Sequence, residues 1–259
     1  MNLFFILLKA SIKSQMQYKA NFIISSLVSG LTIFSDFLLI AILLLKFENI
    51  LDWTLYEVAI IYSIIEFGFG SYRLFFNGLD NFEDLIITGK FDALLIRPIS
   101  TLLHVMIQRF DLRRIGIIIQ SLAVGIFGIA NSNLHENKYF LLLYGLLLFS
   151  SFIITVSINV ILATIAFWTG KNKDRVVLAF YSTRVAASFP LEIYNQFIKF
   201  LLTFIIPFST SAYYPILFIT KKSENVLFLF APLMAIILIV PFALCFWSYG
   251  TKKYRSSGT

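Results

Sequence analysis

The chain has 259 residues, of which 59% are apolar and only 14% are charged, with a mean hydropathy of +0.85. Soluble domains carry about 25% charged residues, and a sphere of this size cannot bury so much Phe, Leu and Ile. A soluble enzyme, a disordered chain and a coiled coil are therefore excluded. The formal net charge of +7 indicates either a nucleic-acid partner or a membrane protein whose positive residues flank its spans on the inner side.

Residues 1–19 are predicted to form an amphipathic helix rather than a secretory signal. Their apolar run ends at Leu8, no basic segment precedes it, and Lys9 follows it. Lys9 and Lys13 lie four positions apart on one side of such a helix, opposite the apolar residues of positions 3–8. This pattern favours a helix in the plane of the membrane interface; the alternative is a cytosolic helical tail.

The chain as a whole, residues 1–259, is predicted to form one all-α polytopic membrane domain, because a bilayer core needs about 20 apolar residues in a helix. A polar segment, 77–114, separates the second span from the third. Before the last span, a broken apolar segment at about 207–220, with Pro207 and Pro215, is expected to re-enter the membrane without crossing it. The six predicted spans are about 22–45, 55–76, 115–130, 139–167, 191–211 and 226–247.

The positions of the basic residues indicate the orientation of this domain. With both termini in the cytoplasm, sixteen of the 21 Lys and Arg residues fall in inner segments, among them Arg184, and four fall in outer loops. This asymmetry agrees with the positive-inside rule. It accounts for the net charge without nucleic acid, and it predicts a multi-pass protein surrounded by membrane lipid.

Motifs for catalysis and cofactor binding are absent from the sequence. The segment nearest to a phosphate-binding loop reads T-G-K-N at 169–172; it lacks the first glycine of G-x-x-x-x-G-K-[ST] and has Asn after the lysine. Cys245, His104 and His135, the chain's one cysteine and two histidines, are too few for a metal site. We therefore expect no enzymatic activity, no metal and no cofactor in this chain.

The polar segment 77–114 is predicted to begin with a short helical hairpin. Phe82, Leu85 and Ile86 give its first helix an apolar face, and Gly89 can end that helix. Lipid head groups and neighbouring spans can cover the apolar face, and so can a partner protein. Acidic residues near the start of the helix favour its dipole: they are Asp80, Glu83 and Asp84.

The second helix of the hairpin, 91–96, stops at Arg97-Pro98, because the residue before a proline leaves the helical region. Residues 89–98 read G-x-F-D-x-L-L-x-R-P, which resembles the inner-loop signature of a bacterial subgroup of the type-2 ATP-binding-cassette (ABC) exporter permeases. The segment F-P-x-x-x-Y at 189–194 and the ending W-x-x-G-x-x-x-Y-x-S-x-G at 247–258 resemble the same subgroup. The resemblance covers the whole chain and agrees with the six-span topology.

The resemblance implies a larger assembly in the plasma (inner) membrane of a bacterium. Two permeases, identical or related, pair, and the inner loop of each supplies a coupling helix that seats in a nucleotide-binding ATPase subunit, present in two copies. ATP and Mg²⁺ would bind that subunit. The family commonly has a Glu-Arg pair where this chain has Ile86-Ile87, so Glu83 or Asp84 would supply the acidic contact. The implied coupling residues are Asp80, Phe82, Glu83, Asp84, Leu85, Gly89, Phe91, Asp92, Arg97 and Pro98.

Three ionisable residues fall inside predicted spans and are candidates for the translocation pathway. Asp36 and Glu66 lie ten or eleven residues from the outer ends of their spans, roughly 15–16 Å deep at 1.5 Å per residue. Lys199 lies eight or nine residues into the predicted fifth span from the inside. These side chains either form a polar wall of the pathway or neutralise one another, with Lys199 pairing one carboxylate.

These observations favour the permease subunit of an ATP-driven exporter that moves an amphipathic or hydrophobic substrate outward by alternating access. The two carboxylates in the spans favour a cationic form of that substrate. One alternative is a secondary carrier without an ATPase, which is expected to show internal repeats and broken helices with ion ligands at the midplane. A less favoured alternative is an intramembrane transferase, whose acidic motif the sequence lacks.

Overall fold

The computed structural model describes residues 9, 12–46, 52–132, 134, 139–169 and 173–255. These residues form a bundle of helices with no strand among them. Within the described part, five helices are long and apolar enough to cross a membrane, or six if a bent pair of helices near residue 206 counts as one span. The five are α2 (Lys19–Lys46), α3 (Leu55–Phe75), α7 (Ile115–Ala130), α8 (Phe140–Thr164, continued by α9, Ala166–Thr169) and α14 (Leu227–Lys253). The predicted all-α membrane fold is confirmed.

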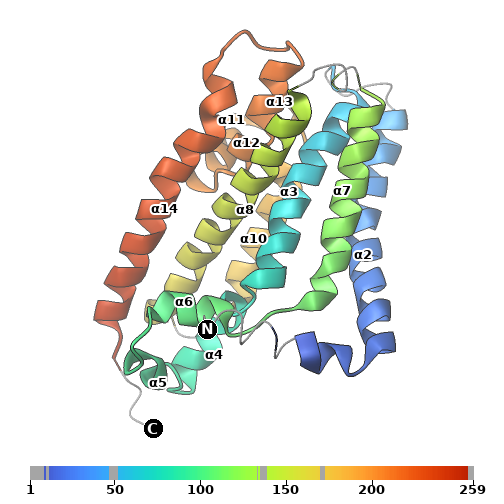
Figure 1. Ribbon diagram of the computed structural model, residues 1–259. Coiled ribbons are helices and arrows are strands. Elements are labelled where there is room, and N and C mark those ends of the chain that lie inside the picture. Colours follow the sequence, from blue (N-terminus) through green and yellow to red (C-terminus); the bar gives the residue numbers. More distant parts are fainter. Residues whose placement is uncertain are drawn as a thin grey trace.

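The two ends of the bundle carry different short helices (Figure 1). At one end lie α4 (Phe82–Ile87), α5 (Asp92–Leu95) and α6 (Thr101–Ile107), next to the C-terminal end of α14. We call this the α4–α6 end. At the opposite end lie α11 (Gln196–Phe200), α12 (Phe208–Ser211) and α13 (Tyr213–Ile219).

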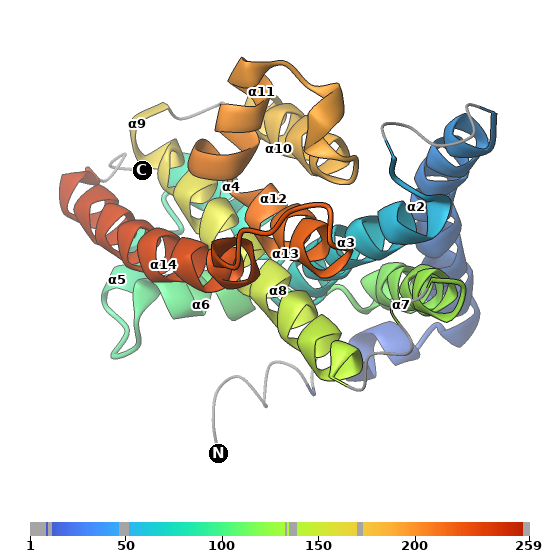
Figure 2. The ribbon, with the colours of Figure 1, turned by 90° about the horizontal axis from the view of Figure 1, so that it is seen from above.

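Helix α3 is the centre of the bundle. Figure 2 shows it between α2 on one side and α8 on the other, and nearly all of its residues are buried. Its start is fixed by a capping box: Glu57 N donates to Thr54 Oγ1 (3.3 Å), and Thr54 N donates to a Glu57 carboxylate oxygen (2.8 Å). Neighbouring helices approach closely at glycines, as at Gly116, where an added Cβ would collide with the backbone of Ser26.

The region between α9 and α14 differs from the prediction. A continuous span over 191–211 does not form, because α11 passes into a π-helical turn (Leu201–Ile205) and the chain then bends by 72° before 208–219. Pro207 explains the break: it has no N–H to donate, and the residue before it leaves the helical region. The bent segment therefore begins at Gln196, before the predicted 207–220.

Helix α10 (Lys173–Ala187), which lies outside every predicted span, packs beside α3. Figure 1 shows it behind α8 and α3, at the level of their middle, and the ring of its Phe180 packs 6.0 Å from that of Phe69 on α3. Arg184, which the distribution of charges assigned to an inner segment, is instead buried between helices.

The N-terminal segment is described only in part. Residues 12–16 are helical and lie across the direction of α2 (Figure 1). Gln15 attaches this turn to the rest of the chain: its Nε2 donates to the carbonyl of Phe110 (2.9 Å) and its Oε1 accepts from Leu112 N (3.0 Å). Most of the predicted interfacial helix, residues 1–8 and 10–11, lies outside the described residues.

Candidate functional site

Residues 77–114 form a chain of short helices that crosses the α4–α6 end. A 3-10 turn (Leu79–Asn81) leads directly into α4. Gly89 ends the hairpin's first arm with φ 68°, a left-handed conformation that glycine adopts without strain. The turn closes when Phe91 N donates to the carbonyl of Leu85 (3.1 Å). The helical hairpin expected from the sequence is therefore present.

An aromatic cluster fixes this hairpin to the ends of two long helices. Phe82 and Phe91 pack edge to face with their ring centroids 5.3 Å apart. The Phe82 ring also lies 5.0 Å from Phe167 of α9 and 4.8 Å from Trp247 of α14. Tyr254, just after α14, packs 5.1 Å from Phe91. The cluster is a rigid connection between α4, α9 and α14.

This cluster corrects the expected role of Phe82 as an apolar anchor that a partner buries. Phe82 and Phe91 are both 0% exposed within their own chain. The apolar spacing of α4 predicted a covered face correctly, but it could not show which surface covers it. Phe167 and Trp247, far away in sequence, supply that surface.

The exposed side of the hairpin consists of other residues. Ile96 is 86% exposed, and Leu95 and Ile87 are 44% and 39% exposed. Among the expected coupling residues, Asp84, Arg97 and Pro98 are exposed, whereas Glu83, Leu85, Gly89 and Asp92 are half-buried. Leu95, Ile96 and Ile87 are thus the exposed apolar residues of the hairpin, and exposed charged residues, Asp84 and Arg97, lie near them in the chain. We call this exposed side the hairpin surface.

The charged residues of the hairpin bond mostly within the chain. Asp80 accepts a hydrogen bond from the hydroxyl of Tyr72 (2.5 Å) and lies 3.5 Å from Nε of Arg73. Arg97 contacts Nε2 of the buried His104 (3.1 Å). Burial and the Arg97 charge together lower the pKa of His104. Asp80 is therefore an internal ligand of Arg73 rather than a surface group.

Halfway along α3, three charged side chains meet in the interior. Arg184 of α10 donates to Glu66 of α3, and its other terminal nitrogen lies 3.4 Å from a carboxylate oxygen of Asp36 on α2. The guanidinium also stacks over the ring of Phe69, 4.6 Å from its centroid. Lys199, the partner expected from the sequence, is half-buried and forms no ion pair with any described residue.

Arg184 is the member of this candidate site that was not singled out from the sequence. The positive-inside rule, applied to each charge by itself, assigned it to an inner segment. Its immediate neighbours contained the signal, since Val185, Ala186 and Ala187 follow it without a charge and Phe180 and Tyr181 precede it. A single arginine in such a stretch pairs with a carboxylate when it is buried.

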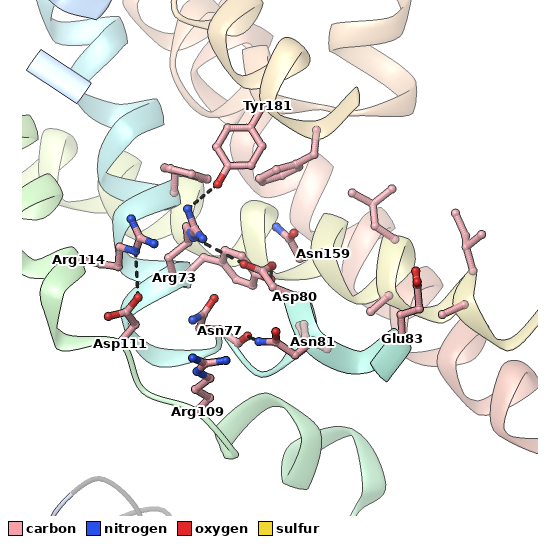
Figure 3. Close-up of a pocket in the computed structure, with 18 of the residues that line it drawn as sticks. Arg73, Asn77, Asp80, Asn81, Glu83, Arg109, Asp111, Arg114, Asn159 and Tyr181 are labelled. Atoms are coloured by element: carbon pink, nitrogen blue, oxygen red, sulfur yellow. Dashed lines mark hydrogen bonds and ion pairs between the residues drawn. The ribbon is translucent and has the colours of Figure 1, made fainter. Parts of the chain in front are cut away.

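A polar cavity of about 310 Å³ lies between the α4–α6 end and the lower parts of α3, α8 and α10 (Figure 3). Four arginines line it: Arg73, Arg109, Arg113 and Arg114. We call it the arginine cavity. Arg73 donates to the hydroxyl of Tyr181 and faces Asp80. The acidic residues at its wall are Asp80, Glu83 and Asp111.

Asp111 orders two of these arginines. It accepts two hydrogen bonds from Arg113 (2.7 and 3.1 Å) and one from Arg114 (3.1 Å), and its N–H donates to the carbonyl of Leu74 (3.1 Å). Burial by itself would raise the pKa of Asp111, but the hydrogen bond from Arg113 and the charges of both arginines lower it overall. Asp111 is therefore a carboxylate at neutral pH.

At the opposite end, a second network attaches the bent segment to the start of α3. Lys222 Nζ lies 2.6 Å from the Glu57 carboxylate and 4.8 Å from the ring centroid of Trp53. The Trp53 ring packs 5.6 Å from that of Tyr213, whose hydroxyl donates to Glu192 (2.6 Å). These contacts close this end around α13.

The sequence of the chain matches a known protein family. The model of a family described as "ABC-2 family transporter protein" matches residues 31–258. The chain belongs to the ABC-2 transporter family. No curated protein and no solved structure matches it.

Membership makes the chain a permease component of an ABC transporter and implies an ATPase partner. In this family the membrane subunit is typically not itself the catalyst, in agreement with the expectation from the sequence. Among the described residues of the permease, no group of three His, Cys, Asp or Glu side chains could hold a metal ion. Two charged sites lie along the described part of the bundle, the cluster of Arg184, Glu66 and Asp36 and the arginine cavity.

Proposed function

We propose that this permease is the membrane subunit of an ATP-driven exporter and that its ATPase docks on the hairpin surface. The observation that carries the proposal is the construction of the hairpin. Its outer side exposes Ile96, Leu95 and Ile87, while its inner side is attached through Phe82 and Phe91 to the ends of α9 and α14. A push on the outer side therefore moves long helices.

The residues of the hairpin divide into two roles in this proposal. Ile96, Leu95, Asp84, Arg97 and Pro98 contact the ATPase, since they are exposed. The remaining residues position the hairpin or transmit its movement. Phe82 and Phe91 act through the aromatic cluster, Leu85 by packing on it, and Gly89 through its turn. Asp80 and Glu83 lie at the wall of the arginine cavity, and the hydrogen bond of Asp92 adds to the effect of burial in raising the pKa of Tyr254.

The proposed assembly contains two permeases, identical or related, and two ATPase subunits that bind ATP and Mg²⁺. It sits in the plasma (inner) membrane of a bacterium with both termini and the α4–α6 end in the cytoplasm. The basic residues of 97–114 support this orientation. ATP-driven closure of the ATPases then moves the hairpins, and the paired bundles alternate access.

Two closures along the bundle support the proposal of outward transport. Asp36, Glu66 and Arg184 form a charged layer at its middle, and the contacts of Lys222 with Glu57 and Trp53 close the opposite end. Substrate entering from the α4–α6 end passes the arginine cavity and then reaches the charged layer before it reaches the closed end. We place Asp36 and Glu66 in the pathway for this reason; Lys199 remains a proposed pathway residue without an ion-pair partner.

The experiment that tests this function is purification of the tagged full chain from membranes of its source cell. We expect a nucleotide-binding protein to copurify with the chain in stoichiometric amount, and we expect the complex to hydrolyse ATP. An Ile96→Asp chain should be recovered from the membrane without that protein, and Ile96→Leu with it. Recovery of a complex free of any nucleotide-binding protein in all three cases would refute the proposal.

A further inference from the structure

Two further cavities share lining residues with the arginine cavity. One, of about 380 Å³, lies against residues 14–22, and the other, of about 410 Å³, lies between α2, α3 and α7. Arg113 lines all three cavities, and Arg73 and Arg114 line both the first and the third. The lining of the third contains these three arginines and no acidic residue. Together the three cavities are lined by four arginines and by three acidic residues, Asp80, Glu83 and Asp111, which leaves a surplus of one positive charge.

The arginines retain donors that the protein does not use. Arg109 forms no ion pair or side-chain hydrogen bond with any described residue, although it lines two of the cavities. Arg114 contacts Asp111 only through Nε, and no described residue bonds to its two terminal nitrogens. Guanidinium groups with free paired N–H donors match the geometry of phosphate and carboxylate groups. The site is built for an anion.

Apart from the arginines, these cavities also have apolar lining residues. Phe69, Phe180 and Leu162 line the first cavity, and Val28 and Ile117 line the third. A cavity of about 310 Å³ falls within the range of small-molecule sites, about 300–1,000 Å³. Phe69, which is 2% exposed, lines both the first and the third cavity, so these two cavities share an apolar wall.

We infer that this space binds the anionic head group, a phosphate or a carboxylate, of an amphiphile whose apolar part lies along Phe69 toward α2. This inference deepens the proposed function and rests on it for the direction of transport. It reverses the cationic substrate expected from Asp36 and Glu66. Those two carboxylates are already bound by Arg184, and a cation coming from the α4–α6 end would first meet a cavity with four guanidinium groups and three acidic residues.

The test compares two probes with the same C12 tail, dodecyl phosphate and dodecyltrimethylammonium, on the purified full chain. Equilibrium binding is measured for wild type, Arg109→Gln, Arg113→Gln and the control Lys252→Gln, which removes an exposed positive charge at the end of α14. Arg109→Gln breaks no contact within the described chain, so its fold is expected to stay intact. Thermal unfolding of each variant checks this.

We expect dodecyl phosphate to bind at least tenfold more tightly than the ammonium probe, and each arginine variant to lose about tenfold, the loss produced by 1.4 kcal/mol. Lys252→Gln should bind as wild type does. Excess inorganic phosphate should compete. Equal binding of both probes, unchanged binding by a stable Arg109→Gln chain, or no competition by phosphate would each overturn the inference, because the tail alone would then explain binding.

The source of the anion is determined with the ATPase complex in phosphatidylcholine vesicles. If dodecyl phosphate stimulates ATP hydrolysis with the same concentration dependence as its binding, the anion is cargo. If phosphatidylglycerol displaces it without stimulation, the anion is a resident lipid of the inner leaflet; both results support an anion site. Failure of the proposed function would show separately, as a chain that binds dodecyl phosphate but never copurifies with an ATPase.

Discussion

Arg184 and Glu66 are 118 positions apart in the chain and form a direct ion pair in its interior, with Asp36 as the third member. The pair attaches α10 to α3 in the middle of the bundle. It also explains how a helix with an arginine in its last turn can lie there, since that charge is paired with carboxylates and stacked on Phe69.

The first prediction concerns the partner of Glu66. Arg184→Leu leaves a buried carboxylate without its cation, and breaking such a pair costs about 3–5 kcal/mol. We expect poor expression and a lower melting temperature in detergent. Adding Glu66→Leu should restore most of the loss. Lys199→Met should be near neutral.

The decisive control for this pair is Glu66→Gln, which keeps the shape of the side chain. If Lys199→Met rescues Glu66→Gln and Arg184→Leu does not, the ion pair described here is not the one that stabilises the bundle.

The second prediction separates docking from transmission in the hairpin. Ile96→Asp should leave the melting temperature unchanged, because Ile96 is 86% exposed. It should weaken ATPase binding at least tenfold, since a buried Ile contributes about 1.5–3 kcal/mol and 1.4 kcal/mol is a factor of ten. Phe82→Ala should instead destabilise the chain itself by about 3–5 kcal/mol.

Ile96→Leu is the matched control and should bind the ATPase normally. A Phe82→Ala protein with wild-type melting and lost ATPase binding would return Phe82 to the partner interface and contradict the burial seen here.

The third prediction uses two glycines in spans. Gly116→Ala should cost about 1–3 kcal/mol, because its Cβ would meet the backbone of Ser26 and push α7 away from α2. Gly145→Ala on α8 has no atom within 4 Å of the new methyl group and should stabilise by about 0.5–1 kcal/mol. Melting temperatures of the two variants in the same detergent should therefore move in opposite directions.

The fourth prediction concerns pH. Burial and Arg97 lower the pKa of His104 in the folded chain, whereas a histidine in an unfolded chain has a pKa of about 6.5. The unfolded state therefore takes up protons first, and stability should fall as the pH drops below about 6.5 toward the lowered pKa. His104→Gln should remove this part of the dependence. Parallel melting curves of both proteins between pH 7.5 and 5.5 would contradict it.

The long helices could be predicted from the sequence, because their limits depend on local composition. The predicted span 115–130 coincides with α7, and α3 starts at Leu55 as predicted. The hairpin followed from Gly89 and Pro98 for the same reason. Its burial could not be predicted, since Phe167 and Trp247 reach Phe82 from distant parts of the chain.

The structure of region 173–219 could not be predicted, because the places of its charged residues depend on contacts with distant parts of the same chain. Arg184 reads as a loop residue until Glu66 is placed beside it. Similarly, the apolar run before Pro207 has the length of a span, but the π-helical turn and the 72° bend depend on how 208–219 packs. The arginine cavity combines residues of four separate segments, and no spacing in the sequence indicated it.

The most direct measurement of the central claim is site-specific photocrosslinking in native membranes. A photoreactive residue at Ile96, at the tip of the hairpin surface, should form a crosslink to a nucleotide-binding ATPase, and the crosslink should change in yield when ATP is added. The same group at Ser223, half-exposed at the opposite end, should form none. A crosslink to the ATPase from Ser223, or none from Ile96 in membranes where that ATPase is present, would contradict the account.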